Sequence, residues 1–125
     1  MGPRPVGGPV VVAFPPEIDD ANAEQTCAQL YEAFASGAAV VIADLTATTF
    51  CDSSGIQQLM KAHAHAISVG AQLRVAVSPR GAVARVVELM GVGETLHIYA
   101  RTDDAAAFLA APTYPGRRAG SPQTE

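Results

Sequence analysis

A fourfold alternation of short apolar runs with longer amphipathic segments constrains the fold of this chain more than any other feature. The apolar runs have strand length, and the segments between them repeat their apolar residues every three or four positions, the period of a helix. The strand-like runs occupy residues 9–14, 40–45, 73–77 and 96–99, and the helical patterns occupy 22–35, 54–69, 79–90 and 102–109. Connections of this length return each strand parallel to a neighbour through right-handed crossovers. We therefore expect an α/β fold: a small single-layer domain with a mostly parallel sheet of about four to five strands and about four helices.

The composition indicates one folded domain with loose ends. The chain has 125 residues, of which 49% are hydrophobic and 16% are charged, and this is enough to bury a core unaided. Residues 1–8 are rich in Gly and Pro, and residues 112–125 combine Pro and Gly with polar side chains. Such compositions are typical of unfolded segments. We expect a flexible N-terminus over 1–8, a domain over 9–111 and a disordered tail over 112–125.

Charge and hydropathy argue against two classes of partner. The formal net charge is -4, whereas proteins that bind nucleic-acid backbones carry clustered Lys and Arg. No apolar run approaches the roughly 18–20 residues that span a bilayer. The N-terminus lacks a signal-peptide pattern, and Val6 stands where a myristoylation motif needs Ser or Thr. We therefore expect a cytoplasmic protein with no direct nucleic-acid or membrane partner.

One connection concentrates the polar side chains. The stretch TATTFCDSSG, residues 46–55, joins the second strand to the second helix, and loops at this place in a parallel sheet form sites. The simpler interpretation is helix capping, because Asp52, Ser53 and Ser54 can accept hydrogen bonds from free amides of the first turn, while Gly55 allows a tight turn. The second interpretation is a phosphoacceptor. A helix N-terminus tolerates a phosphate, which would add about -1.5 to -2 charges to a contactable surface.

The residues offer little support for an enzyme or a metal site. No G-x-S-x-G motif surrounds the two serines, and no histidine is placed to serve them as a base. The apolar stripe of the second helix consists of Ile56, Leu59, Met60, His63 and Ile67. His65 falls on the outer side of that helix and His97 in a strand. His63 and His65 have a spacing that suits a strand and not a helix, so they make a poor metal pair. Cys27 and Cys51 lack metal-ligand spacing and are expected to be reduced core residues. We expect no catalytic residue and no metal.

The segment VVIADLTATTFCDSSGIQQLM resembles the central signature of the STAS domain, specifically that of bacterial anti-sigma-factor antagonists. In that family an apolar strand ends in Asp or Asn, and a loop, an aromatic residue and Asp-Ser-Ser/Thr-Gly then open an apolar helix. The matching positions are Asp44, Phe50, Asp52, Ser53, Ser54 and Gly55. The stretch GAQLRVAVSPRGAVARVVELMGV is similar to the family's next strand and helix, and PPEID stands where the family has a Gly-Glu-Leu-Asp turn. The resemblance covers about residues 9–109.

The resemblance implies a phosphorylation switch. Ser54, the second hydroxyl of the motif, would be the phosphoacceptor, and an anti-sigma factor with serine-kinase activity would be the partner. The unphosphorylated antagonist binds that kinase and frees the sigma factor; phosphorylation weakens the complex, and a separate phosphatase resets it. ATP and Mg²⁺ would belong to the kinase, so no cofactor is expected on this chain. The residues implied to flank the acceptor for recognition are Asp52, Ser53, Gly55, Asp19 and Asp44.

A STAS interaction or ligand-binding module without a phosphorylation cycle is the alternative function. Two features also depart from the family's pattern. The family opens with a strand that pairs against the one expected at 9–14, and here only MGPRPVGG precedes it, which leaves a sheet edge open. Pro15-Pro16 replaces the small, flexible turn before Asp19, which weakens the case for Asp19 more than the case for Ser54.

Overall fold

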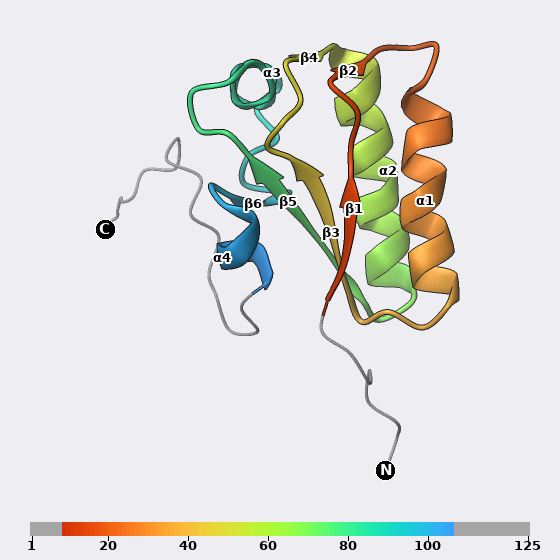
Figure 1. The fold of residues 1–125 in the computed structure, drawn as a ribbon. Helices are drawn as coiled ribbons and strands as arrows, with labels where there is room; N and C mark the ends of the chain where they lie inside the picture. Colours follow the sequence, from red (N-terminus) through yellow and green to blue (C-terminus); the bar gives the residue numbers. More distant parts are fainter. Residues whose placement is uncertain (1–8, 107–125) are drawn as a thin grey trace.

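The sheet and its helices follow the expected α/β alternation (Figure 1). The structure is a computed structural model that describes residues 9–106. Its strands are β1 (Val10–Ala13), β2 (Glu17–Ile18), β3 (Val40–Leu45), β4 (Phe50–Cys51), β5 (Gln72–Val77) and β6 (His97–Tyr99), and its helices are α1 (Ala23–Ala35), α2 (Ser53–Ser68), α3 (Ala82–Met90) and α4 (Thr102–Ala106). Four strands form one parallel sheet in the order β1-β3-β5-β6, and β2 pairs with β4 in parallel. The predicted fold class is confirmed.

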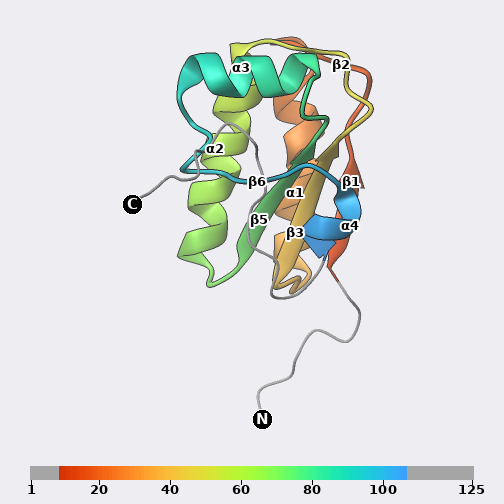
Figure 2. The same cartoon turned by 90° about the vertical axis from the view of Figure 1, so that its left-hand side faces the viewer.

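Helices cover both faces of the sheet, and this explains the continuous apolar runs in its central strands. The helices α1 and α2 lie on one face and α4 on the other, while α3 crosses the end of the sheet (Figures 1 and 2). Alternate residues of β3 and β5 therefore enter two different cores. Val41 and Val75 belong to the main core under α1 and α2, whereas Ile42 packs with Tyr99 and Ala105 on the α4 side. Strands that are buried on both faces lose the polar alternation of a half-exposed strand.

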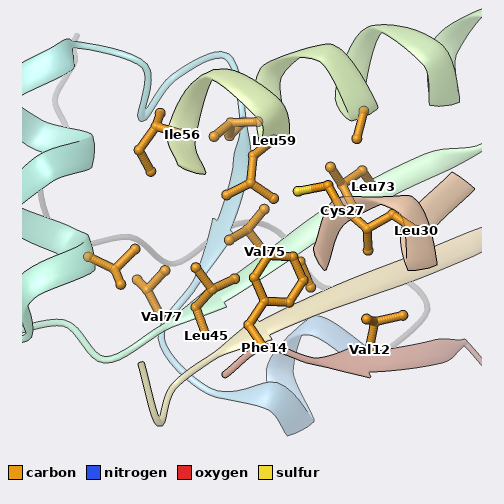
Figure 3. Packing of buried hydrophobic residues seen from close by; sticks show 14 of the residues in the cluster. Val12, Phe14, Cys27, Leu30, Leu45, Ile56, Leu59, Leu73, Val75 and Val77 are labelled. Atoms are coloured by element: carbon orange, nitrogen blue, oxygen red, sulfur yellow. The ribbon is translucent and has the colours of Figure 1, made fainter. Parts of the chain in front are cut away.

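Aliphatic side chains fill the main core. Phe14 and Leu45 from the sheet meet Leu30 from α1 and Leu59 from α2 in the space between the two layers (Figure 3). Both cysteines are free and buried within this cluster. The chain has no Trp, so many small side chains must pack closely to fill this core.

The buried face of α2 differs from the predicted stripe. The prediction placed Met60 and Ile67 on it, but Ile67 is 63% exposed and Met60 only partly buried. The face that packs consists of Gly55, Ile56, Leu59, Ala62 and Ala66. Small residues at the far end of the helix let it approach α1 and the sheet closely, and this sets the rotation of the helix. A hydrophobicity pattern weights Ile above Ala and so mislocates the stripe.

Two histidines of α2 make contacts that the sequence did not indicate. His65 was expected on the outer side of the helix, yet its ring lies 4.8 Å from the ring of Tyr31 and 6.0 Å from that of Phe34. It therefore packs in the seam between α1 and α2. The ring of His63 meets His97 edge-on, with 5.7 Å between the ring centroids. Burial, with a contribution from His97, lowers the pKa of His63.

Buried Arg74 ties α4 to the sheet. Its side chain is 4% exposed, and its Nη1 donates to the carbonyl of Ala105 at 2.8 Å. Its Nε donates to Gln72 Oε1 at 2.9 Å, and the guanidinium lies 5.6 Å from the centre of the Tyr99 ring. A buried charge needs such partners to offset its lost hydration. Arg74 therefore links β5, β6 and α4.

Most predicted boundaries lie within one residue of the observed ones, with one clear error. Helix α3 was expected to begin at Pro79, but Ser78 and Pro79 belong to a turn that Gly81 closes by donating its N–H to the Ser78 carbonyl at 3.0 Å. The helix begins at Ala82. The predicted flexible segment 1–8, the predicted tail 112–125 and the predicted helical residues beyond 106 lie outside the described residues.

Candidate functional site

The short pair of β2 and β4 brings two acidic turns together at one end of the domain. Ile18 is in register with Cys51, and the N–H of Asp52 donates to the Ile18 carbonyl at 3.2 Å. Because the strands are parallel, the chain leaves both at the same end (Figure 1). Asp19 and Asp52 are therefore neighbours, although 33 positions separate them in the sequence.

The Pro15-Pro16 step supports this arrangement. Prolines lack an N–H, but their carbonyls accept hydrogen bonds. The Pro16 carbonyl accepts the N–H groups of Thr49 at 2.8 Å and Phe50 at 3.1 Å, and the Pro15 carbonyl accepts the Thr48 hydroxyl at 2.9 Å. Pro15 and Pro16 replace the family's small turn, yet their carbonyls attach the segment that carries Asp19 to the loop before α2.

Asp52 caps helix α2, as the simpler interpretation of the loop predicted. Its backbone is extended, and its Oδ1 accepts the N–H of Ser54 at 2.9 Å. Asp52 and Ser54 are half-buried, while Ser53 is exposed. Within residues 9–106, neither serine hydroxyl has a hydrogen-bond partner. Capping thus occupies the carboxylate and leaves both hydroxyls available.

Gly55 serves close packing and not the tight turn that the sequence suggested. It lies inside α2, and it is not among the glycines with positive φ. A Cβ at this position would lie 2.7 Å from Cys51 Sγ and 2.8 Å from Ile18 Cγ2. Both distances are below normal contact, so the first turn of α2 rests directly on β2 and β4.

Asp19 organises the turn that leads into α1. Its Oδ1 accepts the N–H groups of Ala21 at 3.0 Å and Asn22 at 3.3 Å. The side chain of Asn22 binds back: its Oδ1 accepts the N–H of Asp19 at 3.0 Å, and its Nδ2 donates to the Glu17 carbonyl at 2.9 Å. The Asp19 carboxylate is therefore held in one place beside the start of α2.

Asp44 is not part of this group. It lies on the sheet face that carries Ile42, opposite α1 and α2. Its Oδ1 accepts both the N–H of Thr46 at 3.0 Å and the Thr46 hydroxyl at 2.6 Å. The structure therefore brings Asp19, Asp52 and the two serines together and gives Asp44 a role in the turn after β3.

Comparison with protein families agrees with this architecture and loop. The sequence profile of the STAS domain matches residues 4–105. The chain belongs to the STAS domain family. STAS domains are generally non-catalytic binding modules that mediate protein–protein interactions. No curated protein shows significant sequence similarity to the chain.

Two acidic turns and an exposed aromatic ring flank Ser54 in this STAS domain. Between Pro9 and Met60 the sequence has seven carboxylates and neither Lys nor Arg. These carboxylates are Glu17, Asp19, Asp20, Glu24, Glu32, Asp44 and Asp52. Across residues 9–106 the one ion pair joins Arg101 and Asp103, so none of the seven is neutralised by a salt bridge. Phe50 is paired with Glu17 and is 48% exposed.

The burial of Ile18 under the site and the exposure of the Phe50 ring beside it were not predicted from the sequence. The available signal was the alternation of Glu17 with Ile18 and of Phe50 with Cys51, in which the second residue of each pair is buried and the first exposed. Two residues are too few for a periodic pattern to be recognised.

The remaining groups of the STAS domain do not form a metal or redox centre in the part that the structure describes. No three His, Cys, Asp or Glu side chains there are placed to share a metal ion. Burial raises the pKa of Cys27 to about 12 and that of Cys51 to about 11, so both thiols stay protonated and unreactive near neutral pH. None of the helices in this part is long and apolar enough to cross a bilayer.

Proposed function

We propose that this STAS domain is an anti-sigma-factor antagonist, which binds an anti-sigma serine kinase in the cytoplasm and is switched off by phosphorylation at Ser54. The observation that supports the proposal is the Ser54 hydroxyl itself. It is half-buried and has no hydrogen-bond partner among residues 9–106, and the Asp52 cap fixes its backbone. A hydroxyl that is accessible and held on a rigid helix start suits a protein kinase, because the enzyme must align it with the transferred phosphoryl group.

The chain would contribute only the acceptor to the chemistry. In the transfer, Ser54 Oγ bonds to the γ-phosphorus of ATP, the bond from that phosphorus to the β–γ bridging oxygen breaks and ADP leaves, while the hydroxyl proton passes to a base of the kinase. ATP and Mg²⁺ belong to the kinase, and the reset belongs to a separate phosphatase. This division agrees with the general character of STAS domains as non-catalytic binding modules.

The phosphate would act at the contact with the kinase. It adds about -1.5 to -2 charges at a position that was neutral. A complex that buries a neutral hydroxyl must then bury a dianion, and desolvating an unpaired charge is costly. The fold itself changes little, since the amides and positive dipole of the α2 N-terminus tolerate an anion. Phosphorylation would therefore weaken the complex without unfolding the domain.

Phosphotransfer to purified variants tests the acceptor. We expect incubation with the cognate anti-sigma kinase and ATP to add the mass of one phosphate to the wild type. The addition should vanish in Ser54→Ala and persist in Ser53→Ala, the matched control on the same turn. Transfer that persists in Ser54→Ala, or that vanishes only in Ser53→Ala, would refute the assignment.

A charge substitution tests the switch. We expect Ser54→Glu to lose kinase binding and keep its circular dichroism spectrum, whereas Ser54→Gln, of similar size and no charge, should retain more binding. Tight binding by Ser54→Glu would count against a charge-based switch. If the kinase binds but no cognate candidate transfers phosphate, the chain is instead a STAS interaction module without a phosphorylation cycle.

A further inference from the structure

Ile18 and Gly55 form a contact that joins the two halves of the candidate site. Ile18 is completely buried at the end of β2, directly before Asp19, and Gly55 is buried in the first turn of α2, directly after Ser54. A Cβ added to Gly55 would lie only 2.8 Å from Ile18 Cγ2, which is closer than normal contact. The hydrogen bond from the Asp52 N–H to the Ile18 carbonyl, 3.2 Å long, joins the same two elements through the backbone.

We propose that Ile18 is a positioning residue for Ser54: its Cγ2 methyl, seated on Gly55, sets how closely the acceptor turn of α2 approaches the Asp19 turn. The inference rests on the proposed role of Ser54 as phosphoacceptor. Ile18 suits this task because a β-branched side chain is stiff at χ1, so its methyl cannot swing aside. Cys51 Sγ would lie 2.7 Å from a Cβ added at residue 55, but Cys51 has a single γ atom and can change its χ1 angle more easily than β-branched Ile18.

A methyl group added at residue 55 would lift the helix start off β2. The added carbon cannot stay within 2.8 Å of Ile18 Cγ2, and the buried isoleucine has no free space to enter. The first turn of α2, which carries Ser54, must then move relative to Asp19. Phosphoryl transfer depends on alignment, and misplacing a reacting group by about 1 Å can cost roughly 100-fold in rate.

Enlarging residue 55 and then reducing the side chains that face it tests the proposal. We expect Gly55→Ala to lower the kcat of phosphorylation by roughly 10- to 100-fold, with a smaller effect on KM. Adding Ile18→Leu, an isomer without the Cγ2 methyl, and Cys51→Ala should restore most of the rate. The control is Ala64→Gly, at an exposed position in the far half of the same helix, which destabilises the helix without touching its packed face and should leave kcat nearly unchanged.

Amide hydrogen exchange gives a readout that does not need the kinase. The N–H of Ser54 bonds to Asp52, and those of Ala21 and Asn22 bond to Asp19. We expect Gly55→Ala to speed exchange at these amides by about tenfold or more, with recovery in the triple variant. If Gly55→Ala fails to fold, Ile18→Leu alone, which vacates the contact from the other side, should speed the same amides.

The outcomes separate the two proposals. A wild type that no cognate anti-sigma kinase phosphorylates overturns the proposed function. A phosphorylated wild type whose transfer rate and exchange are unchanged by Gly55→Ala overturns the positioning role alone. A triple variant no better than Gly55→Ala also overturns it, because the loss would then not come from the contact with Ile18. A loss in Ala64→Gly equal to that in Gly55→Ala would show that helix stability, and not position, controls transfer.

Discussion

Replacing Asp52 separates its structural role from any role in recognition. Asp52→Ala removes the oxygen that accepts the Ser54 N–H at 2.9 Å. Loss of an N-cap acceptor costs about 1 kcal/mol, within a range of roughly 0.5–2. Loss of a carboxylate at a helix N-terminus costs roughly 0.3–1 kcal/mol more at an exposed position. We therefore expect Asp52→Ala to lower the free energy of unfolding by about 1.5 kcal/mol, which is roughly 6–12 °C in Tm for a domain of this size.

Asp52→Asn is the matched variant, because its amide oxygen can still cap the helix. It should lose only the charge contribution, about 0.3–1 kcal/mol. Urea titration followed by circular dichroism measures both variants against the wild type. Two results would refute the reasoning: an Asp52→Ala protein as stable as the wild type, or an Asp52→Asn protein as unstable as Asp52→Ala. Since Asp52→Asn keeps its fold, any loss of kinase binding by that variant reports recognition of the carboxylate itself.

Three further predictions concern His63, the two cysteines and Arg74. Burial lowers the pKa of His63 in the folded state, so protonation of His63 favours unfolding. The contribution of neutral His63 to the free energy of unfolding is complete above the unfolded pKa of about 6.5 and falls as the pH drops below that value. The difference in urea midpoint between pH 7.5 and 5.5 should be smaller in His63→Gln, and an unchanged difference would contradict this. Cys27 and Cys51, with raised pKa values of about 12 and about 11, should resist a disulfide reagent at pH 8 until urea unfolds the chain; rapid labelling of native protein would be inconsistent with their burial. Arg74→Met should cost about 1.5–3 kcal/mol through the lost hydrogen bond to Ala105 and speed amide exchange in α4, and unprotected α4 amides in the wild type would argue against the link.

The sequence predicted the elements that have long, clear patterns. Strands β3 and β5 are buried on both faces, so their apolar runs could be located to within about one residue. The helix start at Asp52 also followed from side-chain chemistry, because Asp and Ser are favoured caps. Membership of the STAS family was inferred from the same loop, and the profile match supports it.

The features that the sequence did not predict depend on contacts between distant segments. The β2–β4 pair has two residues in each strand, too few to show a period. The use of Gly55 becomes clear only when Ile18 is known to pack against it. The rotation of α2 is set by Ala62 and Ala66, whose small size permits close packing but gives a weak hydrophobic signal.

The proposed phosphorylation cycle would depend on a second protein as well as on this fold. The chain has an accessible hydroxyl at Ser54, a cap and an acidic turn, but kinase and phosphatase action are properties of complexes. Sequence pattern and fold can therefore identify Ser54 as the group to test, while the transfer experiment decides whether it is used.

The acidic turns that the β2–β4 pair brings together beside Ser54 have a kinetic consequence. Carboxylates clustered at a surface attract a basic surface of a partner over distances comparable to the Debye length, so the rate of encounter should fall as ionic strength rises. A phosphate on Ser54 would deepen this negative potential and could not repel such a partner from afar. Its effect must therefore come after encounter, as a faster dissociation of the complex. In stopped-flow measurements, phosphorylation should raise the dissociation rate and leave the association rate nearly unchanged.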